Sequence, residues 1–170
     1  MDLNLSDKLI KLTKYSEEDV LYSRFSLENW QYIISDIKSD KEWSNLLKKN
    51  SVIRCYVLKK SYNNEPIGFI YSKQEDFRGN VISLHGGGWD KSVCSSLYYY
   101  RGLILIIKEL ISQNIKVRTS CFENNYRAYK FLRSVGFVRY NTSNGMIYMW
   151  INKRRLQSSK IYKRFFGADF

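Results

Sequence analysis

The sequence has few of the residues that mark metal sites, disulfide frameworks and membrane spans. Its 170 residues include one proline, one histidine and three cysteines. Cys55, Cys94 and Cys121 are odd in number and widely spaced, which is typical neither of a disulfide framework nor of a metal site. The best apolar run, GLILIIKELI, contains Lys108 and Glu109 and is too short to cross a bilayer. We therefore expect no metal ion and no membrane as a partner.

The N-terminus lacks the apolar core of a signal peptide. It reads MDLNLSDKLIKL, with an acidic residue at the second position, which predicts a cytoplasmic protein. The chain shows no internal repeat and no low-complexity segment. Its length suits one domain with a real core, and 44% hydrophobic residues exclude a disordered chain. We expect residues 1–170 to form a single domain.

Positive charge is in clear excess. Lysine and arginine number 28 against 16 acidic residues, a net charge of +12. Such a balance favours anionic partners, namely nucleotide phosphates, nucleic acid or an acidic protein surface. The basic residues are densest in NKRRLQSSKIYKRFF, so we interpret residues 153–170 as a basic C-terminal helix or tail. That segment is either a solvated face or a contact for an anionic partner.

Hydrophobic periodicity predicts the order of the elements. Capping signatures at Ser16 and Ser39 open helical patterns that fill residues 16–49. Alternating or apolar runs after that predict strands, and a 3.6-residue period predicts a long helix over Tyr99–Gln113. The expected strands cover residues 8–15, 51–60, 66–74, 80–85, 117–121, 138–143 and 146–152, with a loop from Gly86 to Leu97.

The strands on either side of the long helix require a crossover connection. Neighbouring parallel strands need such a crossover, which predicts that strands 80–85 and 117–121 are parallel. The strands 51–60, 66–74 and 80–85 are close enough in sequence to form an antiparallel meander. The sequence thus predicts an α/β (α+β) fold with a mixed, mostly antiparallel sheet and helices on both faces.

The stretch FENNYRAYKFLRSVGF predicts a short helix with a defined start and end. Asn124 and Asn125 precede the apolar stripe as candidate N-caps, and Gly136 follows as a candidate C-cap. The stripe itself falls at i, i+3, i+4 and i+7 and consists of Ala128, Phe131, Leu132 and Val135. The sequence therefore predicts a strand, an Asn-capped helix, a Gly-Phe turn and another strand.

This order of elements resembles the GNAT superfamily of N-acetyltransferases over about residues 52–150. EPIGFIY is similar to the family's second meander strand, and NVISLHGGG stands where its bulged central strand enters the cofactor loop. NNYRAYKFLRSVGF is similar to the family pattern N-x-x-A-x-x-x-x-x-x-x-G-F. Two departures are visible: KSVCSSLYYYRGL replaces the usual Q/R-x-x-G-x-G/A, and Leu132 stands where many members have a tyrosine.

The resemblance implies an acetyl-CoA-dependent N-acetyltransferase with a GNAT-like sheet whose central parallel pair splays apart. Acetyl-CoA would be the cosubstrate, and a primary amine would attack its thioester directly. The departures leave an alternative open, namely a non-catalytic module that binds CoA or RNA on the same fold.

The resemblance places the cofactor at the glycines and the serine-rich loop. Backbone N–H groups at a helix N-terminus bind phosphate, and glycines let a ligand approach the backbone. Lys91 and Arg101 could add positive charge there. The alternative reading is a turn followed by helix caps. The candidate cofactor-binding residues are Gly87, Gly88, Ser92, Ser95, Ser96, Tyr98 and Asn125.

His85 and Gly86 are the candidate catalytic residues. His85 is a possible base because its ordinary pKa lies near working pH, although a structural histidine is the simpler reading. The backbone N–H of Gly86 is a candidate oxyanion contact. Tyrosines are possible acids in place of the missing one, although packing is the simpler role for most: Tyr98, Tyr99, Tyr100 and Tyr129.

The sequence does not identify the acceptor amine. A small molecule and a protein amino terminus both remain open, and some relatives of the family modify ribosomal-protein amino termini. The basic surface is compatible with an anionic or ribosomal partner. It argues against polyamines and strongly basic peptide tails, which it would repel.

Overall fold

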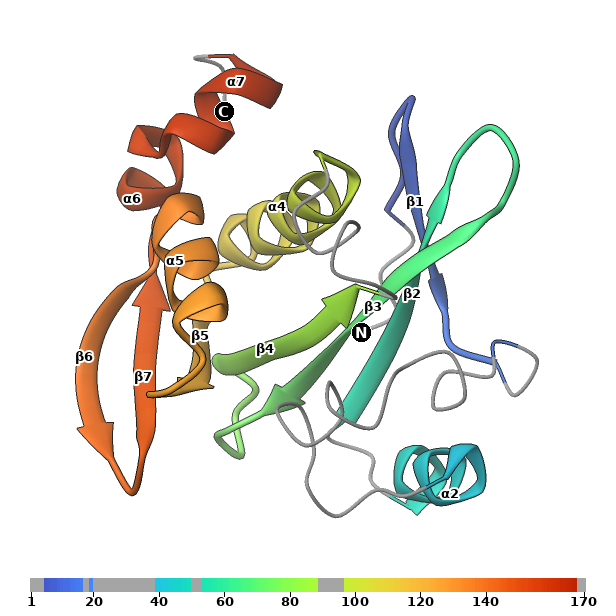
Figure 1. The fold of residues 1–170 in the computed structure, drawn as a ribbon, viewed down its shortest axis with the longest axis horizontal. Helices are drawn as coiled ribbons and strands as arrows, with labels where there is room; N and C mark the ends of the chain where they lie inside the picture. The colour runs from blue at the N-terminus through green and yellow to red at the C-terminus, as the bar shows by residue number, and fades with distance from the viewer. Residues whose placement is uncertain (1–4, 17–18, 20–38, 50–52, 89–96, 168–170) are drawn as a thin grey trace. The chain divides into compact units, whose positions relative to one another are not determined.

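The computed structural model describes residues 5–16, 19, 39–49, 53–88 and 97–167 (Figure 1). Seven strands form one sheet in the order β1-β2-β3-β4-β5-β7-β6, in which β4 and β5 are parallel and the pairs β1–β2, β2–β3, β5–β7 and β6–β7 are antiparallel. The predicted mixed, mostly antiparallel sheet with a parallel pair is confirmed. The strands are β1 (Ile10–Lys14), β2 (Ile53–Lys60), β3 (Pro66–Gln74), β4 (Val81–Gly88), β5 (Lys116–Phe122), β6 (Val138–Ser143) and β7 (Met146–Ile151). The helices are α2 (Asp40–Lys49), α4 (Leu97–Ser112), α5 (Tyr126–Val135), α6 (Lys153–Ser158) and α7 (Lys160–Phe166).

The chain divides into two compact units. We call residues 1–73 and 85–102 the first unit, and residues 74–84 and 103–170 the second unit. The strand β4 and the helix α4 each contribute residues to both, and each unit is described by itself below.

In the first unit, strands β1, β2 and β3 form an antiparallel meander. Leu12 pairs with Leu58, so both side chains lie on one face, and both are buried. A Cβ added to Gly102 of α4 would lie 2.4 Å from Leu58 Cδ2. The helix therefore approaches this face closely because position 102 carries no side chain.

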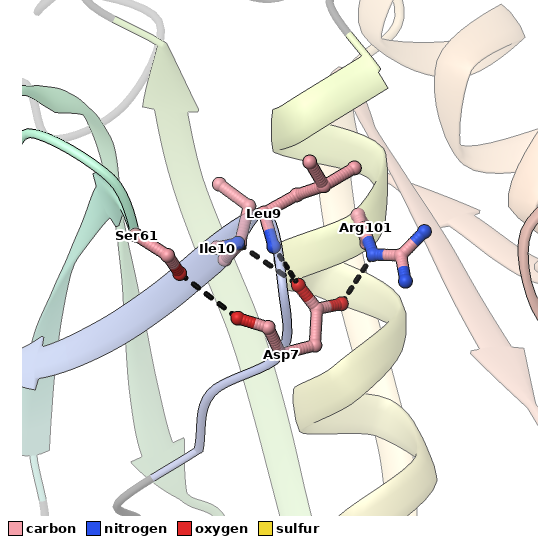
Figure 2. A network of polar contacts seen from close by, with 5 residues as sticks. All are labelled: Asp7, Leu9, Ile10, Ser61 and Arg101. Carbon is pink, nitrogen blue, oxygen red and sulfur yellow. Dashed lines mark hydrogen bonds and ion pairs between the residues drawn. The ribbon is translucent and has the colours of Figure 1, made fainter.

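A polar network fixes the chain before β1 in the same unit (Figure 2). Asp7 Oδ1 accepts hydrogen bonds from the N–H groups of Leu9 and Ile10 at 2.7 and 2.9 Å, while Asp7 Oδ2 pairs with Arg101 Nε of α4. Ser61 Oγ donates to the Asp7 carbonyl at 2.9 Å. One carboxylate thus joins the start of β1 to α4.

In the second unit, β5 and β7 bury one face of the sheet. Along both strands, buried residues alternate with residues that are partly or fully exposed. The buried residues pair across the two strands, and these pairs include Thr119 with Met149 and Cys121 with Ile147. Helix α5 lies along β5, and α7 packs against α5 (Figure 1). The other face of these strands is partly exposed.

The predicted helix of the second unit is confirmed as α5. Asn125 Oδ1 accepts from the Ala128 N–H at 3.0 Å, and Gly136 ends the helix in the left-handed region with φ 112°. Of the predicted apolar stripe, Leu132 and Val135 are buried, while Ala128 and Phe131 are partly exposed.

The basic C-terminal segment is helical and packed. It forms α6 and α7, in which Leu156 and Tyr162 are fully buried and Ser159 caps α7 through a hydrogen bond to the Tyr162 N–H. The basic side chains lie outside while these residues belong to the core of the second unit.

Several predicted boundaries shift, and two of the shifts lie next to the candidate site. The strand β4 continues to Gly88 where a loop from Gly86 was expected, and α4 begins at Leu97 and not at Tyr99. The expected helical region after Ser16 falls on residues 17–38, of which only Asp19 is described. Asp19 Oδ2 accepts from the Ser16 N–H at 2.8 Å, as the capping signature predicts.

Candidate functional site

The end of β4 and the start of α4 belong to the first unit, and they carry most of the candidate residues. His85, Gly86, Gly87 and Gly88 form the last half of β4, and Tyr98 lies in the first turn of α4. Residues 89–96, which come between them in the sequence, fall outside the described residues. This stretch contains the candidates Ser92, Ser95 and Ser96, as well as Lys91 and Cys94.

Gly86 lies in a place that no other residue can fill without movement. A Cβ there would lie 2.2 Å from the Phe69 carbonyl oxygen of β3 and 2.8 Å from Tyr99 Oη. The Tyr99 hydroxyl is buried and donates to the same Phe69 carbonyl at 3.3 Å. The backbone at the candidate oxyanion position is therefore held against both a strand and a helix side chain. The sequence indicated the glycine, but only the fold shows the part played by Tyr99.

His85 packs by its ring on Tyr71 of β3. The two ring centroids are 5.0 Å apart, and the planes are inclined by 21°. The His85 side chain is partly buried, and its desolvation, with a smaller contribution from the positive charge of Lys73, lowers its pKa to about 4. The imidazole is therefore neutral throughout the physiological pH range, which leaves a nitrogen lone pair available but makes it a weak base.

Tyr71 is the neighbour that sequence reasoning missed. It is buried, it pairs with Cys55 across the β2–β3 ladder, and burial raises the pKa of its hydroxyl well above the ordinary value. Tyr71 thus keeps its proton beside His85. Its place in β3 was predictable, but its contact with His85 needs the pairing of strands.

The charge near the start of α4 differs from the expectation. Arg101, a candidate source of positive charge for the loop, is paired with Asp7 (Figure 2). Lys60 of β2 supplies a charge that the sequence did not indicate, with its Nζ 5.7 Å from the Tyr98 ring centroid. Glu65 partly compensates this charge at 2.7 Å. The first turn of α4 contains no acidic residue, which is favourable for an anion.

Asn125 lies in the second unit, where it acts as the N-cap of α5. Its side-chain oxygen is engaged with the Ala128 N–H, so the structure gives it a structural role, and a contact with a cofactor stays a prediction. In the same unit the parallel ladder pairs Val81–Ser83 with Lys116–Arg118. Next to it, the buried Thr119 hydroxyl donates to the Leu84 carbonyl at 2.7 Å. The Leu84 carbonyl, at this point of the parallel pair, thus accepts a hydrogen bond from a side chain.

Two other features bear on the kind of site. Among the described residues, no three His, Cys, Asp or Glu side chains are grouped as metal ligands would be. In the same part of the chain, every helix is too short or too polar to span a bilayer.

Comparison with known proteins gives structural likeness only. No protein-family profile matches the chain, and no curated protein matches its sequence. Many solved structures do match. A GNAT-family acetyltransferase from Bacillus anthracis has a TM-score of 0.74 at 12% identity, with 89% of this chain and 99% of that chain covered.

Two further structures connect the fold to ligands of those proteins. Aminoglycoside acetyltransferase AAC(6')-Ib in complex with coenzyme A and kanamycin has a TM-score of 0.69 at 18% identity, covering 87% of this chain and 97% of its own. The apo form of FdhC, a nucleotide-linked sugar GNAT, has a TM-score of 0.71 at 17% identity. The match covers 98% of this chain and 100% of that chain. The chain described here has the fold of the GNAT acetyltransferases.

Proposed function

We propose that the protein is an acetyl-CoA-dependent N-acetyltransferase that moves an acetyl group to a primary amine. The likeness to the coenzyme A complex of AAC(6')-Ib, over 87% of this chain, carries the proposal. The resemblance of NNYRAYKFLRSVGF and of the glycines after β4 to the GNAT pattern supports it from the sequence.

The first unit supplies the proposed grip on the cofactor. The pyrophosphate would lie against the N–H groups that begin α4, where the first turn lacks acidic residues and Lys60 adds positive charge next to Tyr98. Ser92, Ser95 and Ser96 would add hydroxyl donors from the preceding loop. Gly87 and Gly88 would let the pantetheine arm approach the backbone of β4.

The proposed reaction needs a neutral amine, an oxyanion contact and a path for one proton. The amine nitrogen attacks the thioester carbon, the C–N bond forms and the C–S bond breaks, and CoA leaves as a thiolate. The Gly86 N–H would stabilise the oxyanion, held in place by Phe69 and Tyr99. The neutral imidazole of His85 would take the amine proton only in passing, because its lowered pKa favours release to water.

Leu132 favours a second candidate, a module that binds CoA without catalysis. The side chain is buried in the stripe of α5 and cannot donate a proton to the leaving thiolate. A thiol with an ordinary pKa near 8.5 is, however, a tolerable leaving group without a dedicated acid. Turnover is therefore compatible with leucine at this position.

A thiol-release assay separates the two candidates. Acetyl-CoA is mixed with the protein and with pools of small amines or peptides that have free amino termini, and free CoA is titrated with a thiol reagent. We expect release above hydrolysis for at least one pool, and a Gly86→Ala variant that remains folded should release less. Binding of acetyl-CoA without release in any pool would support the binding module and contradict the enzyme.

A further inference from the structure

A hollow in the second unit is lined by none of the candidate catalytic residues. Its volume is about 550 Å³, and it is formed by the end of α4, the start of β5, the end of β7 and one residue of β6. Its polar and aromatic lining includes Asn114, Lys116, Arg118, Tyr140, Trp150 and Lys153. None of these residues has a part in the proposed acetyl transfer.

Strand register brings the aromatic and cationic side chains of the hollow to one face. Arg118 and Val138 both pair with Trp150, so the three share the partly exposed face of β5, β7 and β6. The register shifts between Arg139 and Asn141, which places Tyr140 in a bulge. Bulges re-aim side chains, and the Tyr140 ring is 47% exposed.

Two of the aromatic rings on this face each have an arginine guanidinium group over them. The Arg118 guanidinium carbon lies 5.5 Å from the Tyr140 ring centroid, and that of Arg155 lies 5.5 Å from the Trp150 ring centroid. Tyr148 extends the surface, with its ring 6.4 Å from that of Tyr140. The face is therefore an aromatic platform with guanidinium groups stacked on it.

The charge of the face is strongly positive. Lys116, Lys153 and Arg155 are exposed around the hollow. Arg118 has an acidic partner, Glu75, at 3.4 Å, and both side chains are partly exposed, so this ion pair is weak. Four cations, of which Arg118 has this acidic partner, thus lie on a surface that also offers flat rings.

We propose that this platform, defined by Tyr140, Tyr148 and Trp150 with Lys116, Arg118, Lys153 and Arg155, binds single-stranded nucleic acid. Bases stack on the exposed rings, and phosphates pair with the surrounding cations. Such stacking tolerates any base, because every base has a π face, while duplexes hide those faces. The proposal does not depend on acetyl transfer.

Other occupants fit the chemistry less well. A second copy of the chain would bring the same cations to the same face and would be repelled. An acidic peptide would satisfy the cations but would add no flat group to the rings and guanidinium groups of the platform. Nucleic acid satisfies both features at once.

The platform lies at the opposite end of β5 from Asn125. Lys116 and Arg118 begin β5, whereas Asn125 and α5 follow its last residue, Phe122. No cofactor candidate of the second unit therefore belongs to the platform.

The test is fluorescence anisotropy of the full chain with a labelled 12-nucleotide oligouridine. We expect the logarithm of the association constant to fall linearly with the logarithm of the salt concentration. The expected slope is about −2, which corresponds to three phosphate contacts at roughly 0.7 each. Tyr140→Ser with Lys116→Gln should weaken binding by roughly tenfold or more, since one stacked base is lost. The same strand in a duplex should bind much more weakly.

A matched control exists on α5, where Tyr126 is 64% exposed and the Lys130 ammonium lies 4.5 Å from its ring centroid. Tyr126→Ser with Lys130→Gln removes the same groups and the same charge, and it should change affinity less than twofold. Tyr140→Phe with Lys116→Arg should retain binding.

Four outcomes would overturn the proposal. They are no binding at low salt, equal losses in the two double variants, equal competition by polyglutamate, and equal binding of the same strand in a duplex. Loss of binding in the platform variant alone, with unchanged circular dichroism, would establish it.

Discussion

Acid should destabilise this protein partly through His85, and the size of the effect follows from its burial. The pKa of His85 is about 4 in the folded protein against an ordinary 6.5 in the unfolded chain. Between these two values the unfolded chain binds more protons, so the free energy of unfolding rises with pH over this window and is level above it. Going from pH 7.5 to pH 5.0 should therefore remove about 2 kcal/mol through His85 alone.

Urea unfolding of the wild type and of His85→Phe at several pH values isolates this contribution. Carboxylates titrate in the same range, but they are common to both proteins, so the difference between the two curves reports His85. The phenyl ring preserves the stacking on Tyr71, whose centroid lies 5.0 Å from that of His85. Tyr71→Phe, which keeps His85, should retain the wild-type pH dependence.

Parallel curves for wild type and His85→Phe between pH 7.5 and pH 5.0 would refute the reasoning. The same titration bears on catalysis. If acetyl transfer is observed, a fall in rate near pH 6.5 that disappears in His85→Phe would mean that the imidazole titrates normally and is not desolvated.

Three further predictions concern packing. Leu132→Ala should cost about 2–5 kcal/mol in urea unfolding and Leu132→Met less than about 1.5, because the side chain is buried and handles no proton; a loss of transfer rate in folded Leu132→Met would contradict this. Gly86→Ala should cost about 1–3 kcal/mol, since its Cβ would lie 2.2 Å from the Phe69 carbonyl oxygen, and an unchanged melting temperature would show that β4 moves freely. Tyr162→Ala should cost about 3–5 kcal/mol because the ring is fully buried, whereas a neutral effect would mean that α7 is dispensable.

Local sequence patterns predicted the elements whose signals lie within the element itself. The strands Pro66–Gln74 and Val138–Ser143 were expected with the bounds observed, and the caps of α5 at Asn125 and Gly136 follow from residue type. These signals depend on side-chain alternation and on backbone preferences, which neighbouring residues determine.

The contacts that define the candidate site depend on distant pairings. Asp7 and Arg101 are 94 residues apart, so the neutralisation of Arg101 cannot be read from its neighbours. The lowered pKa of His85 likewise comes from burial and from Lys73, at the end of β3. The C-terminal segment was interpreted from its charge, while the buried Leu156 and Tyr162 determine its packing.

Thermal unfolding with acetyl-CoA tests the central claim most directly, because a ligand of the folded state must stabilise it. At a concentration about 100 times the dissociation constant, the expected gain is about 2.7 kcal/mol, or roughly 5–10 °C for a chain of this size. ATP at the same concentration is the control for phosphate and adenine. A rise with acetyl-CoA well above that with ATP is the predicted result. A cooperative transition that does not move at millimolar acetyl-CoA, or that moves equally with ATP, would contradict the account.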